Sequence, residues 1–172
     1  CHLAKRGGRN RVHTFVDTDA QSAASMTLDM GWSRRIREAI EHNRFVLACQ
    51  PIVNTRSREI ASYEVLVRML DDDDSLIMPS GFLSTAERFG LSADIDKWII
   101  VHAIETLANQ RQTMPRLRYA INLSAQTLSD DSIADLVQNK LEERALDPAS
   151  LTFEVTETAA IADMPSAQAL LA

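Results

Sequence analysis

The sequence predicts an α/β fold in which a parallel sheet is crossed over by helices. Its 172 residues are 45% apolar and 24% charged, a composition typical of a soluble globular domain rather than of a disordered, collagen-like or coiled-coil chain. From residue 45 onward, runs of strand length alternate with segments of helical periodicity. Alternation of this kind predicts parallel strands joined by helical crossovers, in either an open doubly wound sheet or a barrel.

The first 31 residues are expected to lie outside this sheet. Residues 3–8 predict the end of a helix followed by a glycine turn, and residues 11–16 predict a short strand. Residues 17–31 are small and polar, as in a linker or an inter-domain helix. The chain begins with Cys1 rather than methionine, so we expect it to come from a longer protein.

Helical periodicity marks several segments after residue 31. The predicted helices are residues 32–43, 79–89, 92–110 and about 131–144. Gly90 predicts the end of the second of these helices, and Ser129 is the expected N-cap of the fourth. A further helix is expected to begin at Pro165. His102 falls on the apolar side of the third helix, where we expect it at the edge of the core rather than as a metal ligand.

Four strands complete the predicted pattern. They are residues 45–53, 60–70, 118–125 and 151–157. The first is almost entirely apolar, which predicts a strand covered on both faces, although Pro51 within it ends ladder pairing or marks an edge. The other three alternate polar and apolar side chains. The acids Asp71–Asp74 lack the alternate ligands and the turn glycine of a calcium loop, so a solvated loop is expected there.

Each of the three alternating strands carries an oxygen-bearing side chain on its polar face. These residues are Glu64, Asn122 and Glu154, each near the end of its strand. A carboxylate that faces a core needs an ionic partner or a metal, and hard oxygen ligands suit Mg²⁺ or Mn²⁺ rather than zinc. In a β/α barrel such side chains gather at the C-terminal strand ends, where active sites assemble. Two alternatives stay open: an exposed Glu64–Arg68 pair within one strand, and polar residues that satisfy one another.

Net charge and cysteine content indicate which binding partners and which cellular compartment to expect. The net charge of −6 argues against binding to nucleic acid polymers or anionic membranes, but leaves a nucleotide bound through a metal open. Only Cys1 and Cys49 occur, without metal-ligand spacing, which favours a reducing, cytoplasmic location. The most apolar stretch, residues 98–108, is too short to span a membrane, so membrane anchoring would require regions not present here.

Four motifs resemble, in order, those of the EAL domain, the cyclic di-GMP phosphodiesterase family. They are Gln50-Pro51-Ile52, Glu64-Val65-Leu66-Val67-Arg68, Asn122-Leu123-Ser124 and Glu154-Val155-Thr156-Glu157. The resemblance covers residues 32–172 and implies the N-terminal part of a TIM-like (β/α) barrel, incomplete because the chain ends about midway. Residues 1–16 resemble the C-terminal tail of a GGDEF (diguanylate cyclase) domain, a common tandem partner, with residues 17–31 as the linker.

The resemblance also implies a role for individual residues. The metal ligands that it implies are Glu64, Asn122 and Glu154, with Glu64 also catalytic. The residues that it implies for the dinucleotide site are Gln50, Leu66 and Arg68. Glu157 matches a glutamate that orders a later loop. The implied reaction is hydrolysis of cyclic di-GMP to linear pGpG, in which two divalent metals, Mg²⁺ or Mn²⁺, activate the attacking water.

The chain departs from the family pattern in two ways. Val65 stands where alanine is usual, which should alter packing more than chemistry. The family's paired aspartates and its later lysine, glutamate and glutamine have no counterpart before Ala172, so we expect this chain alone to be inactive.

Two other functions remain as alternatives: a degenerate EAL domain that acts as a non-catalytic cyclic di-GMP receptor, and an interaction domain without a ligand. Receptors of that kind usually lose metal ligands, and all three that fall within this chain are present, which favours the enzyme. Homodimerisation of the full-length protein and the state of its cyclase half are left open.

Overall fold

The computed structural model describes residues 17–155, with their side chains from residue 29 onward. The predictions for residues 1–16, for Glu157 and for the helix at Pro165 lie outside the described residues. The helices and strands, in chain order, are α2 (Asp17–Glu41), β1 (Phe45–Val53), β2 (Ile60–Leu70), β3 (Leu76–Ile77), α3 (Leu83–Phe89), α4 (Ser92–Arg111), β4 (Tyr119–Leu123), α5 (Ala125–Leu128), α6 (Ser132–Glu143) and β5 (Leu151–Val155). Single 3₁₀ turns precede α3 and β5.

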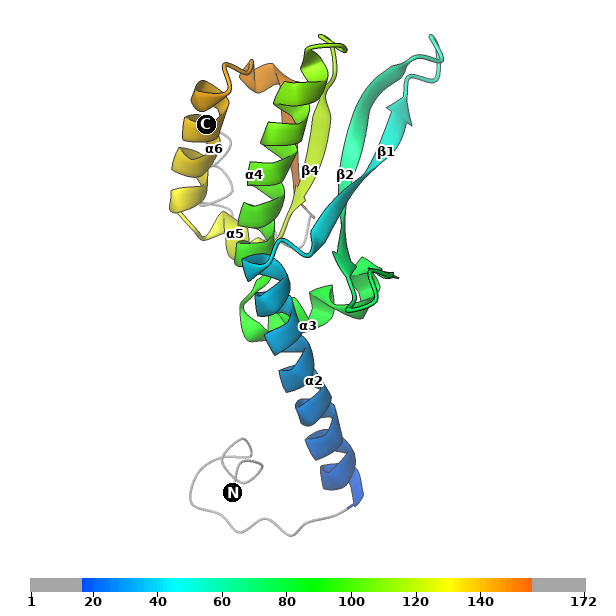
Figure 1. The fold of residues 1–172 in the computed structure, drawn as a ribbon, viewed down its shortest axis with the longest axis vertical. Coiled ribbons are helices and arrows are strands. Elements are labelled where there is room, and N and C mark those ends of the chain that lie inside the picture. Colours follow the sequence, from blue (N-terminus) through cyan, green and yellow to red (C-terminus); the bar gives the residue numbers. More distant parts are fainter. Residues whose placement is uncertain (1–16, 156–172) are drawn as a thin grey trace.

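The strands form one sheet in the order β1-β2-β4-β5, and β3 pairs with the end of β2. β1 and β2 make an antiparallel hairpin, whereas β2 with β4 and β4 with β5 are parallel. Each parallel pair is connected through helices, and Figure 1 shows α4 beside β4 with α6 next to it, while α2 extends away from the sheet. The α/β class with parallel strands and helical crossovers is therefore confirmed.

The helix α4 supplies much of the hydrophobic core. Its buried apolar residues are Ile95, Trp98, Ile99, Ile100, Ala103, Ile104 and Leu107. These residues pack against one face of the sheet, which β2 and β4 line with Val65, Val67, Met69, Tyr119, Ile121 and Leu123. Helical spacing in α4 and alternation in the strands thus direct two apolar surfaces toward each other.

An aromatic cluster joins the start of β1 to α4. The ring of Phe45 lies 5.4 Å from that of Trp98 and 5.7 Å from that of Phe82, between centroids. His102 stacks on Trp98 at 3.8 Å, and its Nδ1 lies 2.8 Å from the Trp98 carbonyl oxygen. His102 is half-buried, so the prediction that it sits at the edge of the core is confirmed.

The structure corrects the prediction for β1. Only Phe45 is fully buried, and the strand is exposed from Cys49 to Val53, so it is not covered on both faces. It lies at the edge of the described sheet, which explains how Pro51 is tolerated, since an edge strand can lack one ladder donor. On the core side the apolar run is explained by Phe45, which lies in the aromatic cluster, and by Leu47, which packs against the core.

The predicted boundaries at two helices also change. α2 is one continuous helix from Asp17, so the segment 17–31 is helical, and the helix predicted from residue 32 begins earlier. Ser129 is not the N-cap of α6, because it closes the short, unpredicted helix α5. The N-cap position of α6 is Asp131, and Asp130 before it accepts hydrogen bonds from the backbone N–H of Ser132 at 3.0 Å and from its hydroxyl at 2.6 Å.

The acidic loop after β2 is solvent-exposed, as predicted. Asp71 pairs with Arg35 at 2.6 Å and Asp74 with Arg44 at 3.1 Å, and Asp72 and Asp73 are exposed. Gly90 ends α3 with a left-handed φ of 70°, again as predicted. Across residues 17–155, no helix combines the length and the apolar character needed to cross a bilayer.

Candidate functional site

The predicted site residues lie on one face of the sheet. Across the hairpin, Gln50 pairs with Glu64, Ala48 with Leu66 and Val46 with Arg68. Residues that pair directly on neighbouring strands point to the same side, so these residues share a face. It is the face opposite Val65 and Val67, which are buried against the helices.

The same face continues across the two parallel strands. Ala120 of β4 pairs with Glu64, so Asn122, two residues further on, has the same orientation. Glu154 of β5 pairs directly with Asn122. The strands β2, β4 and β5 run parallel, so these side chains lie along one row on the face opposite the buried Val65 and Val67. The structure thus places Glu64, Asn122 and Glu154 on adjacent strands of one surface.

Glu64 and Asn122 are in direct contact. The side-chain Nδ2 of Asn122 donates a hydrogen bond to Oε1 of Glu64 at 2.7 Å. The bond occupies the amide nitrogen of Asn122 and leaves its carbonyl oxygen as the group available for a cation. Glu64 is half-buried, whereas Asn122 and Glu154 are exposed. Within residues 17–155, the second oxygen of Glu64 and the carboxylate of Glu154 accept no hydrogen bond.

Two alternatives from the sequence can now be compared with the structure. Arg68 makes no ion pair with Glu64 in the described chain, and its guanidinium donates to the backbone oxygen of Val67 at 2.8 Å instead. The second alternative was that the polar side chains bond to one another, and this applies only to one oxygen of Glu64, which accepts a hydrogen bond from Asn122. The remaining carboxylate oxygens are therefore acceptors without a protein donor in this part of the chain.

These oxygens are the ligand type that a hard divalent cation takes. Glu64, Asn122 and Glu154 together offer two carboxylates and one amide oxygen, a set suited to Mg²⁺ or Mn²⁺. Among the described residues, no group of three or more His, Cys, Asp and Glu side chains is placed to hold a metal. The donors of Glu64, Asn122 and Glu154 are all oxygens, so they fit a hard cation better than the nitrogen and sulfur ligands of a zinc site would.

A hollow of about 490 Å³ adjoins this row at the C-terminal end of β4 and beside the middle of β2. Leu66 and Asn122 line it from the sheet, and α4 contributes Ser92 and Asp96. The buried hydroxyl oxygen of Ser92 has no hydrogen-bond partner among the described residues. In parallel sheets, ligands bind at the carboxyl ends of the strands, so this hollow is the one that the fold assigns to a ligand.

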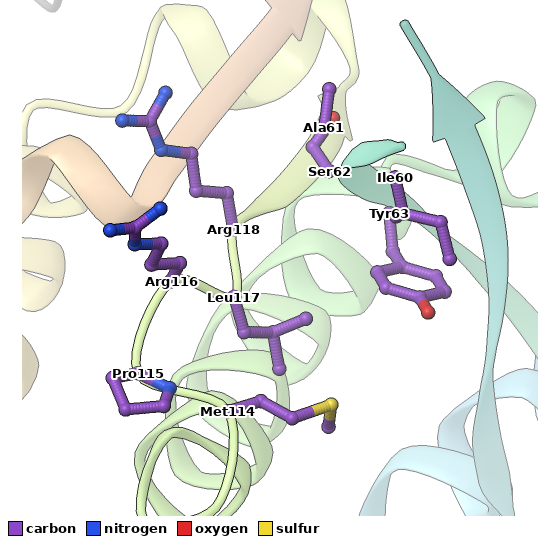
Figure 2. Close-up of a pocket in the computed structure, with 9 residues that line it drawn as sticks. All are labelled: Ile60, Ala61, Ser62, Tyr63, Met114, Pro115, Arg116, Leu117 and Arg118. Carbon is purple, nitrogen blue, oxygen red and sulfur yellow. The ribbon is translucent and has the colours of Figure 1, made fainter. Parts of the chain in front are cut away.

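A second hollow, of about 440 Å³, lies at the opposite ends of β2 and β4. Figure 2 shows Tyr63 on one side of it and Met114 and Leu117 on the other, with Arg116 and Arg118 extending away from Tyr63. None of the predicted site residues lines it, so we do not assign the function to this end.

Asp96 is a functional candidate that the sequence analysis did not single out. It lies on the buried side of α4, and its carboxylate accepts hydrogen bonds from the turn that follows β4. The sequence does hold a signal for it, because Asp96 stands three and four residues before the apolar Ile99 and Ile100, within the stripe of α4 that faces the core. An acid on that stripe needs a specific partner.

The fold and the row of oxygen donors define part of a β/α domain, with Asn122 and Glu154 near the C-terminal ends of their strands and Glu64, contrary to the prediction, in the middle of β2. Comparison with known families agrees: the family described as "EAL domain" matches residues 33–172. The chain belongs to the EAL domain family. The family predicted from the four motifs is therefore confirmed.

Relatives and solved structures support the same assignment. The chain is 39% identical over 137 residues to the cyclic di-GMP phosphodiesterase PdeF of Escherichia coli, covering 80% of this chain and 18% of that protein. It is 31% identical over 161 residues to the cyclic di-GMP phosphodiesterase PdeR of E. coli, covering 93% of this chain and 24% of that protein. The chain thus spans about a fifth of the length of these curated relatives.

Two solved structures carry the same fold. The PaMucR phosphodiesterase in complex with c-di-GMP matches with a TM-score of 0.75 and 30% identity, over 82% of this chain and 57% of that one. The FimX EAL domain from Pseudomonas aeruginosa bound to c-di-GMP matches with a TM-score of 0.73 and 29% identity, over 81% and 55%.

Proposed function

We propose that the protein carrying this chain is a metal-dependent phosphodiesterase that hydrolyses cyclic di-GMP to linear pGpG. The observation that carries the proposal is the row of Glu64, Asn122 and Glu154 on one face of adjacent strands, with Glu64 and Asn122 in contact. Relatives named as cyclic di-GMP phosphodiesterases and neighbours solved with c-di-GMP supply the substrate.

Mg²⁺ or Mn²⁺ is the proposed cofactor, with Glu64, Asn122 and Glu154 as its protein ligands. A divalent cation at such a site lowers the pKa of a bound water and offsets charge on the phosphoryl group. Asn122 holds one carboxylate oxygen of Glu64 in place, which leaves the other oriented for the cation. The half-buried position of Glu64 reduces its exposure to competing water and strengthens its interaction with a cation.

Gln50, Leu66 and Arg68 are proposed to contact the dinucleotide. All three share the face of Glu64, and Leu66 lines the hollow at the strand ends. The guanidinium of Arg68 makes a single bond to a backbone oxygen and has further donors for a phosphate. Glu157, outside the described residues, keeps its expected loop-ordering role as a prediction.

The expected cytoplasmic location, the GGDEF tail and dimerisation of the full-length protein also stay predictions. The receptor alternative is less well supported, because the oxygen donors that a metal needs are present.

The test is release of pGpG by the full-length protein that carries this chain, followed by chromatography with Mn²⁺ and then with a chelator in excess. The proposal expects turnover with Mn²⁺ and its loss on chelation. Binding of cyclic di-GMP without any pGpG release would establish a receptor instead. Turnover that survives chelation would overturn the role given to the metal.

A further inference from the structure

Asp96 is a buried acid at the junction between the core and the candidate site. Its residue is 7% exposed, and its helical neighbours Ile95, Ile99 and Ile100 are buried. A carboxylate in such surroundings is costly unless it is hydrogen-bonded. The contacts that it makes should therefore be important to the fold around it.

The carboxylate of Asp96 connects α4 to the turn between β4 and α5. Its Oδ2 accepts a hydrogen bond from the backbone N–H of Ser124 at 2.7 Å and another from the hydroxyl of the fully buried Thr127 at 2.5 Å. The hydroxyls of Ser124 and Thr127 lie 3.1 Å apart, and Ser124 caps α5. Burial raises the pKa of Asp96, and the hydrogen bonds from Thr127 and Ser124 act in the opposite direction.

The turn that Asp96 holds follows directly on Asn122. Ser124 is the second residue after Asn122, so the bond to its N–H fixes the backbone where β4 ends. A second anchor holds the same turn from α5, because Gln126 donates to the backbone oxygen of Glu87 at 2.7 Å and accepts from the N–H of Ser92 at 3.3 Å. Hydrogen bonds therefore connect the turn that follows β4 to both α3 and α4, close to the position of Asn122.

We propose that Asp96 is a positioning residue for the metal site: by holding Ser124 and Thr127 it fixes the end of β4 and so the orientation of Asn122 beside Glu64. The inference rests on the proposed function, in which Asn122 is a metal ligand. Partners that orient a ligand from behind typically change metal affinity by about 10- to 100-fold when they are removed. Asp96 also lines the hollow, so direct contact with the substrate is the competing role.

The test compares Asp96→Asn, Thr127→Val and Asp94→Asn in the full-length protein. Asp96→Asn weakens both bonds, whereas Thr127→Val removes one donor with little change of shape, at a residue that does not line the hollow. Asp94 is an exposed acid on the first turn of the same helix, so Asp94→Asn makes the same charge change away from the turn. Mn²⁺ affinity is measured without substrate by titration calorimetry, and kcat and KM are measured at saturating Mn²⁺.

The positioning role predicts that Asp96→Asn weakens Mn²⁺ binding by about 10- to 100-fold. Thr127→Val should weaken it by about two- to tenfold, the effect of one hydrogen bond, and Asp94→Asn should leave it unchanged. Excess Mn²⁺ should restore most of kcat in both affected variants. If Asp96→Asn does not fold, the Mn²⁺ affinity of Thr127→Val still tests the positioning role.

A rise in KM of Asp96→Asn with unchanged Mn²⁺ affinity, and no effect of Thr127→Val, would overturn the inference and make Asp96 a substrate contact. If the wild-type protein is active and both variants bind Mn²⁺ as tightly as wild type, the inference about Asp96 is wrong, while the proposed function stands. A wild-type protein that binds no Mn²⁺ would overturn the proposed function together with it.

Discussion

Replacing Glu64 by Gln should separate the fold from the activity. The carboxylate makes one hydrogen bond among the described residues, to Nδ2 of Asn122 at 2.7 Å, and a glutamine carbonyl can accept the same bond. A hydrogen bond to a charged group contributes about 1.5–3 kcal/mol and a neutral one about 0.5–1.5 kcal/mol, so the loss in unfolding free energy should be about 1 kcal/mol. The half-exposed position reduces it further, because solvent weakens the charge–dipole attraction.

The effect of Glu64→Gln on the reaction should be far larger. Residues that only orient a metal ligand cost about 10- to 100-fold on removal, so loss of a charged ligand itself should lower kcat/KM by about 100-fold or more. The assay is pGpG release by the full-length protein with Mn²⁺, beside thermal and urea unfolding of the same preparation. Glu59→Gln, an exposed acid in the β1–β2 hairpin, is the matched control and should behave as wild type.

Two results would refute this reasoning. Activity within about twofold of wild type would show that Glu64 is not a ligand. A fall in unfolding free energy of several kcal/mol, beyond the range of a single hydrogen bond, would show that Glu64 acts through the fold.

Three further predictions concern other parts of the chain. Arg68→Ala should raise KM for cyclic di-GMP with kcat little changed, because a phosphate contact made in both ground and transition states affects binding; a fall in kcat alone would contradict this. Ile104→Ala, at a fully buried position in α4, should lower the unfolding free energy by about 2–5 kcal/mol in urea, and a change below about 1 kcal/mol would show a loosely packed core. Hydrogen bonds from Lys97 and then Ser132 lower the pKa of Asp130 to about 2, so its carboxylate stabilises the folded state above about pH 4, and that stability is lost as the pH falls toward 2. The Tm difference between wild type and Asp130→Asn should therefore shrink as the pH falls from about 4 to about 2. A Tm difference that does not change with pH would show that the contact with Lys97 does not stabilise the folded state.

Local patterns were sufficient to predict the strand faces. Successive side chains on a strand point to opposite sides, so the alternation around Glu64, Asn122 and Glu154 placed them on the face opposite the buried residues. The Gly90 helix end could also be predicted, because a left-handed residue after a helix strongly favours glycine.

Features that depend on distant partners could not be predicted. The contact of Asn122 with Glu64 joins residues 58 positions apart, and the bonds of Asp96 cross 28 and 31 positions. The exposure of β1 was missed because an apolar run does not reveal which neighbours will cover it. The N-cap of α6 was misplaced because α5 intervenes, a four-residue helix too short to show a hydrophobic period.

The central claim is that Glu64, Asn122 and Glu154 hold one divalent cation on the face of the sheet opposite the buried Val65 and Val67. Its most direct measurement is the anomalous scattering of Mn²⁺ in crystals of the full-length protein. The account predicts a manganese peak with oxygens of all three side chains at about 2.0–2.4 Å, the usual range for hard cations. A peak bound by other residues, or a site in which Asn122 keeps its bond to Glu64 and contacts no cation, would contradict the account.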